Sequence, residues 1–250
     1  MKLSAENYFS PENELKYMGH TQFVNFLECE ARALALIRGE WSEEPTTSML
    51  VGSYVDAYFE GTLDKFKETH LTLFTQKGEL KSEFRQAEKI IARIERDEMF
   101  SRYMSGQKQV IKTGEICGVP FKIKIDSYHR TKALVDLKII KDFQPVWKNG
   151  EKQPFAQAWG YDIEAAIYQT IEGNKLPFFL ATATKEKPEP DIAIISIPQE
   201  RIDECMTSVY VLAPYYNDLK HGVGTPKRCG RCAYCRATKK LTEIVDYREI

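Results

Sequence analysis

Two aspartates and a lysine near the middle of the chain have the types and the spacing of a hydrolytic metal site. Asp126 is followed ten residues later by Asp136, and Lys138 comes two residues after that. Side chains alternate along a strand, so Asp136 and Lys138 would project from the same face. Carboxylate oxygens are the ligands that Mg²⁺ prefers. We expect the three side chains to converge on one spot, where they could polarise a phosphodiester and activate a water beside the metal.

Three further polar residues flank this motif along the chain. Asp56 follows Gly52 by four positions, inside an otherwise apolar stretch that we expect to be helical. Gln157 and Tyr161 are also four residues apart, so on a single helix they would share one face. Each has an ordinary alternative interpretation, with Asp56 solvated and Gln157 and Tyr161 forming a surface pair.

Apolar periodicity predicts the elements that must position these residues. Before the motif, we expect helices over residues 21–38, 46–59 and 81–104. Around and after it, we expect strands over 110–116, 121–126, 132–138, 178–183 and 192–197. The remaining predicted helices cover residues 154–171 and 198–219. This order favours an α/β fold with a central mixed β-sheet flanked by helices.

The chain length and composition narrow the classes of protein. We expect one domain over residues 1–250: a helical part (about 1–105), a sheet core (about 106–200), and a C-terminal helix with a cysteine tail (about 198–250). With 43% hydrophobic residues and a net charge of −1, the chain is neither disordered nor a basic coat protein. No apolar run approaches the roughly 20 residues that span a bilayer. We expect a cytoplasmic protein without a membrane partner.

Three of the six cysteines are close together in the tail. Cys229, Cys232 and Cys235 have two residues between neighbours, so their thiolates can turn inward around one metal centre. Such a centre needs a fourth ligand, and His221 is one alternative for Zn²⁺. Reduced free thiols are the other interpretation.

The segment from residue 225 to 240 carries six basic residues and no acidic one. Beside a metal site that acts on a phosphodiester, we expect such a segment to contact phosphates. The tryptophans Trp147 and Trp159 could stack on bases, although a buried position is the expectation for Trp159 on its helix. The six basic residues are Lys227, Arg228, Arg231, Arg236, Lys239 and Lys240.

The order of the motifs resembles the PD-(D/E)xK nuclease superfamily, and within it the RecB-type and RecE-like (phage-type) exonucleases. The resemblance runs from about residue 21 to residue 161, and it implies a restriction-endonuclease-like fold. The motifs that carry it are Gly52-x3-Asp56, Asp126, Asp136-x-Lys138 and Gln157-x3-Tyr161.

The resemblance also implies roles for individual residues. Asp126 and Asp136 would be metal ligands, together with the backbone carbonyl of Leu137. Lys138 would be the catalytic lysine, while Gln157 and Tyr161 would organise the site or hold DNA. This chain departs from the pattern at Asp56, where the subgroup usually carries a histidine, but aspartate is also a competent ligand for Mg²⁺ or Mn²⁺.

The cysteines extend the resemblance. Some RecB-like nucleases hold a [4Fe–4S] cluster with one N-terminal and three C-terminal cysteines, and Cys29 is similar in placement to that N-terminal ligand. The tail spacing departs from theirs, because their last two cysteines are further apart. The resemblance therefore implies a [4Fe–4S] cluster on Cys29, Cys229, Cys232 and Cys235, with Zn²⁺ as the alternative.

The activity implied is that of a deoxyribonuclease dependent on Mg²⁺ or Mn²⁺. As a phage or prophage-type exonuclease, it would act on duplex DNA ends in recombination or repair, with a single-strand annealing protein as a partner. The alternative is a catalytically inactive nucleic-acid-binding or assembly module that retains the nuclease fold and a structural metal site.

Overall fold

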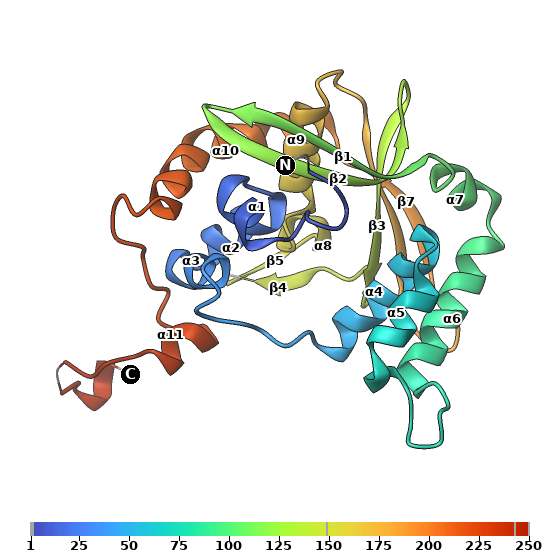
Figure 1. The fold of residues 1–250 in the computed structure, drawn as a ribbon, viewed down its shortest axis with the longest axis horizontal. Helices are drawn as coiled ribbons and strands as arrows, with labels where there is room; N and C mark the ends of the chain where they lie inside the picture. The colour runs from blue at the N-terminus through green and yellow to red at the C-terminus, as the bar shows by residue number, and fades with distance from the viewer. Residues whose placement is uncertain (1–2, 149, 243, 250) are drawn as a thin grey trace.

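The computed structural model describes residues 3–148, 150–242 and 244–249, and its centre is a five-stranded sheet of order β1-β2-β3-β6-β7 (Figure 1). The β3–β6 pair is parallel, and the other neighbouring pairs are antiparallel. A two-stranded hairpin, β4–β5, lies outside this sheet. Each predicted strand overlaps an observed one. The strands are β1 (Gln107–Ile116), β2 (Val119–His129), β3 (Ala133–Ile140), β4 (Val146–Lys148), β5 (Glu151–Gln153), β6 (Phe178–Thr184) and β7 (Ile192–Ser196).

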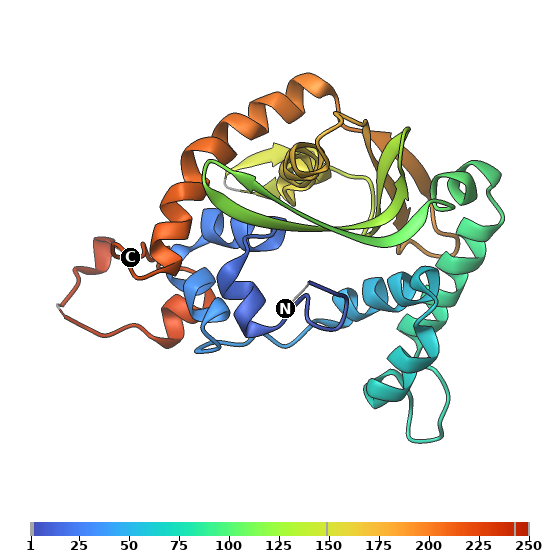
Figure 2. The same cartoon turned by 45° about the horizontal axis from the view of Figure 1, so that its top comes forward.

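Helices precede, interrupt and follow the sheet. Figure 2 shows α9 running along the inside of the curved sheet, with α10 beyond it. Before the sheet come α1 (Pro11–Lys16), α2 (His20–Glu28), α3 (Glu30–Ile37), α4 (Thr47–Glu60), α5 (Leu63–Thr69), α6 (Ser82–Glu95) and α7 (Glu98–Tyr103). Later come α8 (Phe155–Ala158), α9 (Tyr161–Glu172), α10 (Gln199–Lys220) and α11 (Ala233–Ala237), and 3-10 turns cover Leu71–Leu73 and Tyr247–Glu249.

The two faces of the sheet bury two different hydrophobic cores. On β3, Leu134 packs into a core that includes residues of α2, α3, α9 and α10. Its neighbour Val135 packs into a second core with residues of α4, α6 and α7. This alternation follows from the two-residue period of a strand, and it leaves both faces of β3 covered.

Three of the predicted helices are each divided into two. The first is divided at Cys29, whose backbone is extended (φ −165°, ψ 106°) between α2 and α3. The second is divided before α7, where the Asp97 side chain accepts a hydrogen bond from the Phe100 N–H. The third is divided at Gly160, whose left-handed backbone (φ 73°) separates α8 from α9. Hydrophobic periodicity continues across all three breaks, so it does not reveal them.

Among the described residues, no helix combines the length and the apolarity that crossing a membrane requires.

Candidate active site

The residues of the central motif line a cleft of about 480 Å³ beside the sheet. Asp126 comes from β2, Asp136 and Lys138 from β3, and Asp56 from α4. Residues of α2 and α3 complete the wall opposite α4. The structure therefore brings together four of the residues singled out from the sequence, and we call this cavity the acidic cleft.

Asp126 is held by the two strands that flank β2. The Leu137 N–H of β3 donates a hydrogen bond to Asp126 Oδ2 (2.9 Å). From β1, Gln109 Nε2 donates to Oδ1 (3.1 Å). Gln109 has a left-handed backbone (φ 51°), which is uncommon outside glycine and recurs at functional sites. Gln109 is not expected from the sequence, because nothing in its local pattern marks a left-handed residue within a strand.

Lys138 lies between two carboxylates. Its Nζ is 2.5 Å from Asp136 Oδ2 and 2.9 Å from Glu164 Oε2, and it lies 4.8 Å from the centre of the Tyr161 ring. Burial by itself lowers the pKa of this lysine, but Asp136 and Glu164 outweigh that effect and raise the pKa well above its usual value. Lys138 is therefore a fixed positive charge at the centre of the cleft.

Glu164 is a buried member of the cleft that the sequence analysis missed. It extends from α9, and besides Lys138 it lies 3.4 Å from His20 Nδ1 of α2. His20 Nε2 in turn donates to the Gly160 carbonyl (2.9 Å). Burial opposes ionisation of Glu164, but Lys138 and His20 outweigh it and lower its pKa to about 2. In the sequence, Glu164 looks like an ordinary acidic residue within the helix predicted over residues 154–171.

For two carboxylates of the cleft, those of Asp56 and Asp136, the negatively charged form is unfavourable. Burial, followed by repulsion from Asp126, raises the pKa of Asp56 well above its usual value. Burial, followed by repulsion from Glu164, does the same for Asp136. Apart from their ion pairs with Lys138, the buried atoms Asp136 Oδ2 and Glu164 Oε2 have no hydrogen-bond partner among the described residues. A divalent cation would relieve this repulsion, so the donor set fits Mg²⁺ or Mn²⁺.

Gln157 and Tyr161 do not share a helix face, contrary to the sequence-based expectation. Gln157 belongs to α8 and Tyr161 begins α9, because the left-handed Gly160 lies between them. Tyr161 faces Lys138, whereas Gln157 lines a neighbouring cavity. The prediction that Trp159 is buried is wrong as well, since 48% of its surface is exposed.

Four cysteines from opposite ends of the chain form a second cluster, here named the cysteine centre. The sulfur atoms of Cys29, Cys229, Cys232 and Cys235 all lie within 4.8 Å of one another. Cys29 Sγ is 3.6 Å and Cys229 Sγ is 4.0 Å from Cys235 Sγ. The expected approach of Cys29 to the tail is therefore observed.

Backbone groups support the cysteine centre. The Cys232 N–H donates to Cys229 Sγ and the Cys235 N–H donates to Cys232 Sγ, both at 3.4 Å. Burial opposes ionisation of Cys229, but backbone N–H groups outweigh it and lower the pKa of this thiol to about 6. His221, the alternative fourth ligand, is not among the clustered residues, and its Nδ1 hydrogen-bonds the Asn217 carbonyl instead.

The basic residues of the tail do not line the acidic cleft. Within the described chain, Arg231 is the member of this set that lines the neighbouring cavity. Arg228 folds back on the tail, where its guanidinium donates to the Cys235 carbonyl (3.1 Å) and lies over the Tyr234 ring. Part of the predicted phosphate-binding segment therefore has a structural role around the cysteine centre.

Comparisons with known proteins agree with the arrangement of the cleft. Residues 19–238 match the family model described as a PDDEXK-like domain of unknown function, DUF3799. A crystal structure of a protein from Eubacterium rectale, provisionally described as an exonuclease, shares 45% identity and a TM-score of 0.95, covering 100% of this chain and 98% of that one.

Two other comparisons add nothing to this assignment. The crystal structure of SSO0001 covers 88% of this chain and 98% of its own, but the identity is 15% and the TM-score 0.34, too low to inform the fold. A search of curated proteins finds no significant match. On the strength of the family match and the 45% identical structure, the chain belongs to the PDDEXK-like family DUF3799 of the PD-(D/E)xK nuclease superfamily, with the mixed-sheet α/β fold of restriction endonucleases.

Proposed function

We propose that this protein is a metal-dependent deoxyribonuclease that degrades DNA from its ends. The observation that carries the proposal is the convergence of Asp56, Asp126 and Asp136 with Lys138 in one cleft. The end-directed activity is supported by the 45% identical protein, which is provisionally described as an exonuclease.

In this proposal, the residues that converge in the cleft have separate roles. Asp126, Asp136 and the Leu137 carbonyl would hold Mg²⁺ or Mn²⁺, with Asp56 as a further ligand. The bound metal would supply the polarisation of the phosphodiester and the activation of the attacking water. Lys138, fixed by Glu164, would neutralise charge on the phosphate. The Tyr161 ring, which lies against the Lys138 ammonium group, would restrict the movement of this side chain.

The biological role that we propose is the resection of duplex ends in recombination or repair, of the phage or prophage type. A single-strand annealing protein would then receive the strand that remains. These parts of the proposal rest on the resemblance of the motifs.

The decisive experiment uses end-labelled linear duplex and closed-circular duplex DNA, each with Mg²⁺, with Mn²⁺ or with EDTA. We expect metal-dependent loss of the linear DNA and an intact circle. Cleavage of the circle as well would replace the exonuclease with an endonuclease. DNA binding without cleavage under every metal condition would favour the catalytically inactive binding module.

For the cysteine centre we propose a single tetrahedral metal ion, with Zn²⁺ the ion that suits four thiolates. Zinc–sulfur bonds of about 2.3 Å place tetrahedral sulfurs about 3.8 Å apart. The distances of 3.6 and 4.0 Å match that separation. In a [4Fe–4S] cluster each thiolate binds a different iron atom, so the four sulfurs are held further apart.

Metal analysis of protein purified without oxygen tests this assignment. We expect about one zinc per chain, little iron and a colourless solution. A brown protein with about four iron atoms per chain would restore the [4Fe–4S] cluster, and protein with neither metal would leave four free thiols.

A further inference from the structure

A second cavity, of about 690 Å³, adjoins the C-terminal half of α2. Val24 and Leu27 of α2 line it, whereas His20, Thr21 and Asn25 of the same helix line the cleft. We name it the hairpin cavity, because the β4–β5 hairpin forms one wall. The residues on which its chemistry depends are Glu28, Arg32, Trp147, Lys148, Gln157 and Arg231.

We propose that the hairpin cavity binds an unpaired nucleotide of single-stranded DNA, with its base stacked on Trp147. The proposal rests on the deoxyribonuclease function proposed above and goes further, because it assigns a separate site for a strand that has left the duplex. The volume lies within the range of ordinary small-ligand pockets, so it accommodates a nucleotide.

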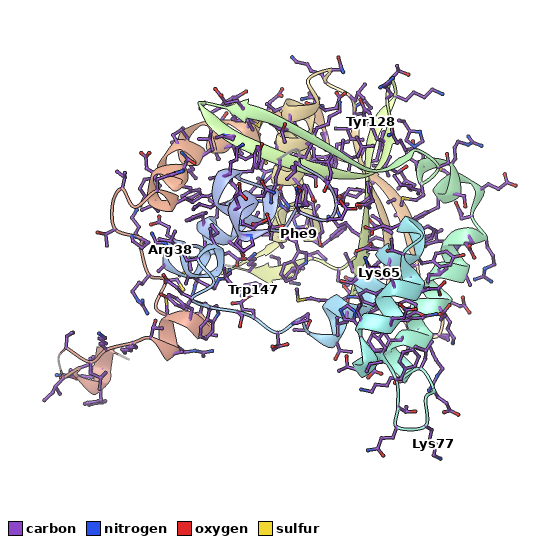
Figure 3. The ribbon with its side chains drawn as sticks, in the orientation of Figure 1. Phe9, Arg38, Lys65, Lys77, Tyr128 and Trp147 are labelled. Atoms are coloured by element: carbon purple, nitrogen blue, oxygen red, sulfur yellow. The ribbon has the colours of Figure 1, made fainter. Side chains whose placement is uncertain are left out.

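Trp147 provides the stacking surface. It lies on β4, and 69% of its surface is exposed. In Figure 3 it lies near the middle of the view, between Arg38 and Lys65. Within the described part of the chain, its indole ring makes no hydrogen bond, ring contact or cation contact. An exposed tryptophan that contributes nothing to the core is a surface on which any unpaired base can stack.

Gln157 provides a polar group for the edge of the base. Its side-chain amide is exposed, and it has no hydrogen-bond partner among the described residues. A free amide has both donors and an acceptor, which suits the hydrogen-bonding edge of an unpaired base. Because Gln157 and Tyr161 are separated by the turn at Gly160, one short segment contributes to both the hairpin cavity and the acidic cleft.

Three cations on the cavity wall could contact a phosphate backbone. They are Arg32, Lys148 and Arg231, and the acidic groups on the same wall are Glu28 and the thiols of the cysteine centre. Glu28 also fixes the two cations nearest to it, with contacts of 2.7 Å to Arg32 and 2.9 Å to Lys148. The Arg32 Nε is buried and has no hydrogen-bond partner among the residues that the structure describes. Stacking surfaces combined with a basic groove are typical of single-strand binding sites.

The test measures binding without cleavage. A labelled dT12 oligonucleotide and a blunt duplex are titrated with protein in EDTA, and fluorescence anisotropy follows binding. We expect Trp147→Ala to weaken dT12 binding about fivefold or more, the change that the loss of one stacked base produces, and Trp147→Phe to retain most of the affinity. Duplex binding should change less than about twofold. Tyr210→Ala, which removes an aromatic ring that is also 49% exposed but lies on α10, is the matched control.

A second measurement observes the stacking itself. Trp41 and Trp159 are changed to phenylalanine, so that Trp147 is the remaining tryptophan. Quenching of its fluorescence by dT12 supports the proposal. Unquenched fluorescence together with unchanged dT12 affinity in Trp147→Ala would overturn it. An equal loss of duplex affinity, or tighter binding of rU12 than of dT12, would overturn it too. Because EDTA prevents metal-dependent cleavage, a protein that binds dT12 as expected but never cuts DNA would refute the proposed function alone.

Discussion

The acidic cleft and the cysteine centre adjoin the same helix, α2, but they are assembled in opposite ways. In the cleft, Asp126 and Asp136 come from neighbouring strands of the sheet and are fixed by a backbone hydrogen bond and by Lys138. The cysteine centre joins Cys29 to a tail segment that packs on it through a small cluster of its own. The cleft is therefore preorganised by the fold, whereas the cysteine centre would depend on the proposed metal for much of its stability.

The largest effect should come from removing a ligand in the acidic cleft. Asp136→Asn takes away a charge that would bind the metal, so we expect cleavage to fall about a thousandfold or more, because the metal supplies several kcal/mol of transition-state stabilisation. DNA binding in EDTA should stay within about threefold. Initial rates on end-labelled duplex measure the loss, with the exposed Asp64→Asn as the control. Full activity in Asp136→Asn would show that the cleft is not the active site.

The second-largest loss of cleavage activity should come from changing Glu164, which we expect to position Lys138. Glu164→Gln keeps the shape but removes the ion pair, so kcat should fall about 10- to 100-fold while KM for DNA changes little. The matched control is Glu172→Gln on the same helix, which breaks a similar ion pair with Lys112 (3.0 Å) outside the cleft. If both variants lose the same activity, the loss reflects the stability of α9 and not the position of Lys138.

A cysteine substitution should act on stability first. Cys235→Ser removes one of four ligands, so we expect bound metal to be lost and Tm to fall by about 10 °C, which corresponds to a few kcal/mol in a domain of this size. The remaining protein should cut DNA at a rate within about fivefold of the original at low temperature. Cys205→Ser, which alters a buried thiol of α10 outside the cluster, should keep the metal. Loss of all cleavage in folded Cys235→Ser would contradict the independence of the two regions.

The smallest effect is expected at Gly160, in the turn between α8 and α9 that adjoins both the acidic cleft and the hairpin cavity. Gly160→Ala forces a side chain into a left-handed backbone, and its Cβ would lie 2.9 Å from Val24 Cγ2. We expect a loss of about 1–3 kcal/mol in unfolding free energy, measured by urea titration. Gly173→Ala has the same left-handed strain but no atom within 4 Å of its Cβ, so the difference between the two variants isolates the close approach to α2. Equal losses would show that the contact with Val24 adds nothing.

How much of the site could be predicted depends on how far apart its residues lie along the sequence. Asp126, Asp136 and Lys138 lie on a hairpin, where the two-residue period brings them together, so the sequence pattern was sufficient. Glu164 lies 26 residues beyond Lys138 on a helix, and His20 lies on another helix before the sheet. Only the packing of α2 and α9 against β3 brings them to the lysine, and local periodicity carries no information about that packing.

The division of the predicted helices shows a second limit on what the sequence alone can predict. Gly160 is visible in the sequence, but a glycine within an apolar periodic pattern can simply be tolerated in a helix. Here the left-handed backbone of Gly160 separates the two helices, so that the side chains of Gln157 and Tyr161 lie in different cavities. At Cys29 no helix-breaking residue marks the sequence at all, and the extended backbone lies beside the tail, where the Ala31 N–H donates to the Lys227 carbonyl. The resemblance of the motifs identified Cys29, where the residue pattern could not.

The separation of Cys29 from the tail cysteines along the sequence has a consequence for biosynthesis. Cys29 and Cys235 are 206 residues apart, so this whole stretch must be translated before the last cysteine can meet the first. The residues of the sheet and of the acidic cleft precede the tail, so they leave the ribosome before it. Completion of the cysteine centre therefore requires translation as far as residue 235, and a chain shortened before residue 229 would lack three of the four cysteines. A metal bound at this centre would be absent from such truncated chains.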